Sequence, residues 1–118
     1  MPGISIHVVD VSRGVLCDGM EVALHALDAG GGQKLIAQGR IGRSGLLENP
    51  ALHEVFAEGR YRAVFQIGKY YEDAQVEPPL VPFLDVVTYE FGVDDPQQHY
   101  HLPMKCTPWG YSCFRGGA

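Results

Sequence analysis

Short runs of alternating apolar and polar residues, separated by turn residues about every 8–12 positions, most restrict how this chain can fold. The runs are rich in β-branched or aromatic residues and are bounded by Gly, Pro, Asp or Ser, which is typical of β-strands. A shorter apolar run, residues 46–52, is interpreted as a small additional strand. The other predicted strands are residues 4–11, 20–27, 34–41, 58–67 and 83–93, with two more between 99 and 116. Seven or eight such strands predict an all-β sandwich.

Residues 68–79 contain the one plausible helix, which we expect to run for about two turns before Pro78 and Pro79 stop it. The chain has 118 residues, of which 46% are hydrophobic, and this is the size and composition of one compact domain. We therefore expect residues 1–118 to form a single β-sandwich domain with one short helix.

The charge and the lack of long apolar runs argue against several classes of partner, and the cysteine content indicates the compartment. The net charge is −5, and no run of Lys or Arg exists, so neither nucleic acid nor an anionic membrane is an expected partner. No apolar run approaches the ~20 residues that span a bilayer, and the first residues do not have the pattern of a signal peptide. The three cysteines, Cys17, Cys106 and Cys113, have no CxxC spacing, which favours reduced thiols in a cytoplasmic protein.

The two ends of the chain resemble a known family. The opening "IHVVDVSRG" is similar to the pattern HVLD followed by RG, and the ending "HYHLPMKCTPWGYSCFRGG" is similar to HYH(V/L)P followed by SP(Y/W)GYSTYRGS. These patterns belong to the transthyretin-like family, and the ending belongs to its 5-hydroxyisourate hydrolase branch. The resemblance covers almost the whole chain in the right order. It implies a transthyretin-like β-sandwich, a homotetramer built as a dimer of dimers, and a site between subunits that includes the tail.

The resemblance implies catalytic roles for two histidines. His7 occupies the position of the His in HVLD, and His99 that of the first His in HYH. An imidazole titrates near neutral pH and can take a proton from an attacking water. His101 shares a strand face with His99, and two such histidines can also hold zinc. Because no further ligand follows at suitable spacing, we favour proton transfer and predict no metal.

Three family positions carry different residues here. Leu46 stands where the family pattern TNxDGR has its Arg, although Arg43 lies nearby. The family ending YRGS is replaced by FRGG, so Phe114 and Gly117 lack the phenol and the hydroxyl, while Arg115 is retained. Each change removes a polar group. The predicted substrate-binding residues are Leu46, Arg43, His101, Phe114, Arg115 and Gly117.

The sequence therefore favours a hydrolase that needs no cofactor and opens a urate-derived ring, either 5-hydroxyisourate or an N-methylated analogue. His7 and His99 would position and deprotonate the water that attacks a cyclic amide carbonyl. One alternative is a binding protein without catalysis, of the transthyretin type, for which an apolar channel would be suited. Another is an enzyme of changed chemistry, a cyclase or isomerase, that uses the two histidines as acid and base.

Overall fold

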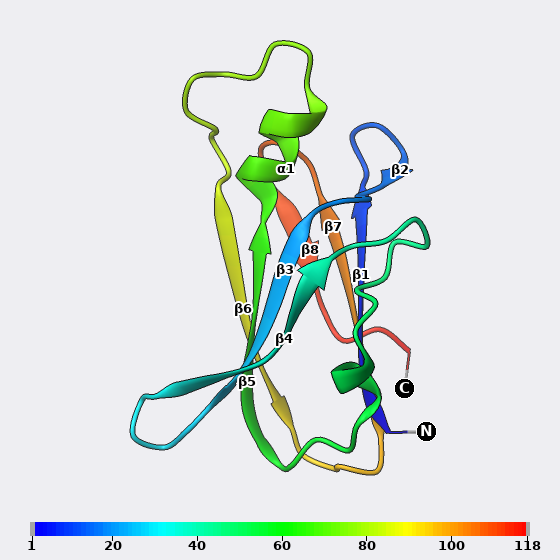
Figure 1. Cartoon of the computed structure of the whole chain (residues 1–118), viewed down its shortest axis with the longest axis vertical. Coiled ribbons are helices and arrows are strands. Elements are labelled where there is room, and N and C mark those ends of the chain that lie inside the picture. Colours follow the sequence, from blue (N-terminus) through cyan, green and yellow to red (C-terminus); the bar gives the residue numbers. More distant parts are fainter. Residues whose placement is uncertain (1, 118) are drawn as a thin grey trace.

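Two four-stranded sheets with a shared apolar core make up the fold (Figure 1). This computed structural model describes residues 2–117. The first sheet has the order β2-β1-β7-β8 and the second the order β4-β3-β5-β6. The strands are β1 Gly3–Asp10, β2 Val15–Leu16, β3 Glu21–Leu27, β4 Gln33–Arg40, β5 Gly59–Gln66, β6 Val86–Val93, β7 His99–Cys106 and β8 Tyr111–Cys113. The predicted all-β sandwich is confirmed.

Alternation along the strands decides which side chains enter the core. In β1, Ile4, Ile6 and Val8 are buried, whereas the residues between them are only partly covered. In β7, Tyr100, Leu102 and Met104 are buried in the same way. The period of two therefore leaves the opposite face of this sheet for polar side chains.

Helix α1, Ile67–Ala74, follows β5 directly and has the two turns that the sequence predicted. Its buried residues include Ile67, Tyr70 and Tyr71, so one side of the helix packs on the sandwich. The chain becomes extended at Gln75, ahead of the prolines that prevent a further turn.

The prediction of a small strand at residues 46–52 is wrong. The segment instead contains a 3₁₀ helix, η1 Pro50–His53, capped by the Asn49 side chain, which accepts a hydrogen bond from the Ala51 N–H. Proline is favoured at the start of a helix because its missing N–H would have no partner there. Single bridges at Leu46 and Leu47 are the only pairing of the β type recorded for this segment within residues 2–117.

Apart from shifts of one residue at strand ends, one strand boundary and one short strand also differ from the sequence prediction. Strand β6 begins at Val86 and not at residue 83, because the proline-containing approach leaves Phe83 exposed and outside the sheet. Strand β2 was not predicted, since it consists of two exposed residues and carries no periodic pattern.

Candidate functional site

A cluster of imidazoles lies on the outer face of the sheet formed by β1 and β7. The two strands are parallel, and their register pairs Gly3 with His99, Ser5 with His101 and His7 with Pro103. Side chains of one face therefore alternate along both strands with the buried core residues. This pairing brings His99 and His101 to the same sheet face as His7, although both are more than ninety positions further along the chain.

Ser5 connects two of the imidazoles. Its Oγ lies 2.8 Å from His99 Nε2 and 2.6 Å from His101 Nδ1. A hydroxyl has one proton to donate, so Ser5 donates to one ring and accepts an N–H from the other. Ser5 thus fixes the orientation of both rings and couples their tautomers.

His7 completes the cluster from the same strand as Ser5. Its ring centroid lies 6.4 Å from that of His101. The loop at residues 41–47 covers His7, because the Val8 N–H donates to the Gly45 carbonyl at 2.9 Å and Leu46 forms a bridge with His7. Gly45 has φ +84°, and a Cβ there would lie 2.6 Å from His7 Nε2. Only glycine therefore allows this close approach.

The environment of the cluster favours neutral imidazole at His101. Burial lowers the pKa of His101, and the neighbouring rings of His7 and His99 lower it further by charge repulsion. A neutral ring has one nitrogen free to accept a proton. The cluster can consequently supply both a proton acceptor and N–H donors to a molecule at its surface.

The tail of the chain packs beside β7. The Gly116 N–H donates to the His101 carbonyl at 2.8 Å, and a Cβ on Gly116 would lie 3.0 Å from the His101 ring. Arg115 donates to the His99 carbonyl, and its guanidinium carbon lies 4.1 Å from the centroid of the Tyr100 ring. The tail thus holds the backbone that carries both histidines of β7.

The other predicted substrate-binding residues are less closely joined to the imidazoles. Arg43 is exposed in the turn before Gly45. Phe114 is exposed, with the Lys105 amine 5.7 Å from its ring centroid, and Gly117 is exposed with φ +38°.

Leu46, in contrast, is partly buried and lines a hollow of about 350 Å³ next to Ser5. Most of the lining surface is apolar, and the polar groups in it come from Ser5, Glu48, Asn49 and His53. Pockets of this volume accommodate small organic molecules. The complete lining is Ile4, Ser5, Leu46, Leu47, Glu48, Asn49, Pro50, Leu52 and His53.

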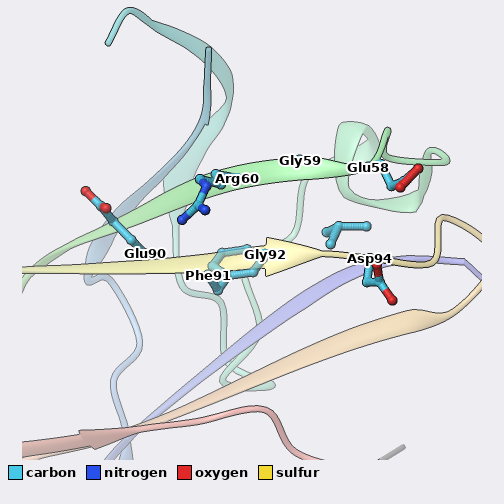
Figure 2. A pocket seen from close by; sticks show the side chains of 8 residues that line it. Glu58, Gly59, Arg60, Glu90, Phe91, Gly92 and Asp94 are labelled. Atoms are coloured by element: carbon cyan, nitrogen blue, oxygen red, sulfur yellow. The ribbon is translucent and has the colours of Figure 1, made fainter. Parts of the chain in front are cut away.

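A more open hollow, about 750 Å³, lies along β5 and β6 and contains no histidine. Figure 2 shows that its side chains come from these two strands and the residues at their ends, among them Arg60, Glu90 and Phe91. Carboxylates and one guanidinium at a sheet edge offer no imidazole for proton transfer, so we assign the candidate site to the histidine cluster.

The described residues include neither a metal-binding cluster nor a membrane-spanning helix. Within residues 2–117, no group of three or more His, Cys, Asp or Glu side chains is placed to hold a metal ion. In the same part of the chain, no helix has the length and apolar character needed to cross a membrane.

Sequence reasoning did not assign Ser5, Gly45 or Gly116 to the site. The signal for Ser5 was its spacing of two from His7, which places both side chains on one strand face. For Gly45 and Gly116, a single sequence does not show whether the glycine is needed for a turn or for a close approach to an imidazole.

Known proteins of similar sequence and structure identify the family. A model of the HIUase/Transthyretin family matches residues 4–116. The chain is 34% identical over 114 residues to 5-hydroxyisourate hydrolase 2 from Rhizobium meliloti (strain 1021), covering 96% of this chain and 94% of that protein. It is 36% identical over 117 residues to 5-hydroxyisourate hydrolase from Ralstonia nicotianae, covering 98% of this chain and 99% of that protein.

A solved structure of (S)-allantoin synthase superimposes with a TM-score of 0.86 at 31% identity. The match covers 98% of this chain and 43% of the synthase chain, so this chain corresponds to less than half of that protein. The order of strands, the position of the short helix and the extent of these matches agree with the resemblance seen in the two ends of the sequence. The chain belongs to the HIUase/transthyretin family.

Proposed function

We propose that this protein is a hydrolase that needs no cofactor and opens a urate-derived ring, either 5-hydroxyisourate or an N-methylated analogue. The observation that carries the proposal is the Ser5-linked pair of imidazoles, with His7 beside them and an apolar hollow adjoining. Support also comes from relatives named 5-hydroxyisourate hydrolase that are similar over almost the whole chain.

In the proposed reaction His7 and His99 act on the attacking water from the two ends of the cluster, with His101 between them in the strand register. One of these imidazoles takes a proton from the water while the oxygen attacks a ring carbonyl carbon. The C–N bond of the cyclic amide then breaks, and the ring nitrogen takes the proton back from the imidazolium. The products are an N–H group and a carboxylic acid, which releases its proton to solvent and becomes a carboxylate, so atoms and charge balance without a cofactor.

Ser5 and His101 act together in positioning. The hydroxyl holds His99 at 2.8 Å and His101 at 2.6 Å, so neither ring needs to be oriented during the reaction. His101 stays neutral because its pKa is lowered, which avoids a second positive charge next to the imidazolium that forms. We assign it to substrate binding through its remaining ring nitrogen.

The substituted positions point to a substrate less polar than 5-hydroxyisourate. Leu46 offers the hollow beside Ser5 a side chain without charge or hydrogen-bonding groups. An N-methyl group buries well against this side chain, whereas an unmethylated ring N–H that faces Leu46 would lose its water without gaining a partner from that residue. Phe114 and Gly117 remove further polar groups from the tail, and Arg43 and Arg115 are the cations that remain near the site.

We further propose that the protein assembles as a homotetramer, a dimer of dimers, in the cytoplasm. Strands β6 and β8 lie at sheet edges, and an unpaired edge can pair with a second copy. The three cysteines are free, as expected in a reducing compartment. Light scattering of the purified protein tests the assembly, and a monomeric mass would contradict a site shared between subunits.

Stopped-flow absorbance tests the activity. 5-Hydroxyisourate is generated in place from urate by urate oxidase, and trimethylated isourate is assayed in parallel. We expect the protein to accelerate the decay of at least one compound, and His7→Ala to reduce this acceleration by about 10²–10⁴-fold. Decay of both compounds at the uncatalysed rate, in protein shown to be folded, would refute the hydrolase.

Leu46→Arg separates specificity from catalysis. The added cation should shift the ratio of kcat/KM toward the unmethylated compound, because it supplies a partner for polar ring oxygens. Leu46→Met is the matched control, since it keeps an apolar side chain of similar size. An unchanged ratio in Leu46→Arg would remove Leu46 from the argument about methylation.

A binding protein of the transthyretin type is the second candidate. The apolar lining at Leu46 and the exposed ring of Phe114 favour it, because both offer surface to an aromatic ligand. Ligand binding that is unaffected by His7→Ala, together with an absence of turnover, would support this second function.

A further inference from the structure

Cys17 and Cys106 form a buried pair of thiols on the core side of the first sheet, the face opposite to that of the imidazoles. Their Sγ atoms lie 3.7 Å apart, and both residues are 0% exposed. Cys17 follows β2, and Cys106 is the last residue of β7, so the pair lies between two segments that are 89 positions apart. The third cysteine, Cys113, is separate and partly exposed.

We propose that Cys17 and Cys106 are a reversible dithiol–disulfide site that low-molecular-weight disulfides oxidise. The sulfur atoms need to close from 3.7 Å to the ~2.05 Å of a disulfide bond, a movement within reach of side-chain rotation. This site is independent of the proposed ring-opening function.

The chemistry starts at Cys106. Its Sγ lies 3.7 Å from two possible donors, the Cys17 thiol and the Tyr71 hydroxyl. The hydrogen bond from Cys17 lowers the pKa of Cys106 against the opposing effect of burial, and Tyr71 adds to the lowering, while the Asp10 carboxylate raises it. The hydrogen bond to Cys106 and burial raise the pKa of Cys17. Cys106 is consequently the thiol that ionises first.

Oxidation then proceeds in two exchanges. The Cys106 thiolate attacks one sulfur of the small disulfide, forming a mixed disulfide and releasing one small thiol. Cys17 loses its proton and attacks Cys106 Sγ, releasing the second small thiol and closing the protein disulfide. The protein gives up two electrons and two protons, and the small disulfide is reduced to two thiols.

A reagent reaches the pair by local opening at β2. Residues 11–16 are all exposed, and β2 is held to β1 by the pairing of Val9 with Leu16 and Asp10 with Val15. The Cys17 N–H also donates to the Val8 carbonyl, and Arg13 donates to Asp10 and to the Tyr70 hydroxyl, so an opening has to break these bonds as well. Such a local opening still requires less free energy than global unfolding, so the thiols become accessible in folded protein.

A disulfide here would bind the β2 hairpin to β7 and close a long loop of the chain. Cross-links that close long loops strongly restrict the unfolded chain, so we expect the midpoint of thermal unfolding to rise by on the order of 10 °C. Along β7 the buried Cys106 alternates with the side of the strand that carries His99 and His101, so the thiols and the imidazoles lie on opposite faces of the sheet. Oxidation should therefore leave the kcat/KM of ring opening within about twofold.

The experiment uses the full chain with Cys113→Ser, which keeps the pair and removes the exposed thiol. After incubation with oxidised glutathione we expect an intact mass lower by about 2 Da, no thiol titrated in denaturant, and a raised unfolding midpoint, all reversed by dithiothreitol. The same protein carrying Cys17→Ser as well retains one thiol and should show neither the mass loss nor the stabilisation. Cys106→Ser in the Cys113→Ser background is the mirror control.

The proposal is overturned if Cys113→Ser keeps both thiols in oxidised glutathione while folded and loses them only after denaturant is added. A disulfide that lowers the unfolding midpoint would also overturn it, because the native fold would then be strained by the bond.

Discussion

Replacing Ser5 by alanine is the most direct test of how the imidazoles are held. Alanine removes the hydroxyl that bridges His99 and His101 but keeps the strand and the adjoining apolar surface. The Ser5 hydroxyl bonds only to these two rings among the described residues, so its removal takes no hydrogen bond from the core or from the loop at residues 41–47. We therefore expect the fold to remain.

The size of the effect follows from two hydrogen bonds. A neutral hydrogen bond contributes about 0.5–1.5 kcal/mol, so the bonds to His99 and His101 hold the rings with about 1–3 kcal/mol together. If this orientation is needed in the transition state, its loss lowers kcat/KM by about 5- to 150-fold, because about 1.4 kcal/mol corresponds to a factor of ten. Ser5→Ala should act mainly on kcat, since Ser5 orients groups that transfer protons.

The assay is ring opening in the stopped-flow instrument, with Ser5→Thr as the matched control. Threonine restores the hydroxyl and should recover activity to within about fivefold of the wild type. An NMR titration of the His101 ring gives a second measurement, because losing the hydrogen bond to the Ser5 hydroxyl should move the pKa of His101. If Ser5→Ala retains wild-type kcat/KM, or if Ser5→Thr is as impaired as alanine, the hydroxyl does not position the imidazoles.

Three further predictions concern other parts of the fold. An NMR titration of the His101 ring should have a midpoint below 6.5, because burial and the neighbouring imidazoles lower the pKa of His101; a midpoint at or above 6.5 would contradict this. Asp10→Asn should lower the free energy of unfolding by about 2–3 kcal/mol at pH 7, because the Asp10 carboxylate accepts charge-assisted hydrogen bonds from Arg13 and Ser12. Since the folded pKa of Asp10 lies below 3.8, the wild type should lose this stability as pH falls below about 4, measured by urea titration, whereas Asp10→Asn should not. Gly45→Ala should lower both kcat/KM and the free energy of unfolding, because its Cβ would displace His7 and strain a φ of +84°. Expressed as free energies, the loss of transition-state stabilisation from kcat/KM should exceed the loss of stability measured by urea titration.

Local periodicity was sufficient to predict most of the fold. The alternation that buries Ile4, Ile6 and Val8 in β1 is visible in the sequence, as is the interruption of α1 before its prolines. It was not sufficient at residues 46–52, where an apolar run resembled a strand. There the cap from Asn49 and the position of Pro50 outweigh the aliphatic content of the run, and a 3₁₀ turn forms.

The site could be predicted only in part, because its geometry depends on pairing between distant strands. The resemblance named His7 and His99, but a motif gives no register. The role of Ser5 appears once β1 and β7 are known to be parallel and Ser5 is opposite His101. A shift of one residue in that pairing would turn the imidazoles into the core. No single-sequence pattern contains this information.

The bridge between Leu46 and His7 explains how specificity and chemistry can vary separately in this site. Leu46 is fixed by its backbone, which pairs with His7, while the Gly45 carbonyl accepts from the Val8 N–H. Its side chain, in contrast, faces the hollow beside Ser5 and takes no part in that pairing. Replacing Leu46 by Arg should therefore alter what the hollow binds without moving the imidazole, because the backbone pairing of residue 46 with His7 does not use its side chain. Position 46 can thus determine which substrate is bound while the three histidines keep their arrangement, and this separation is what the ratio of kcat/KM in Leu46→Arg would measure.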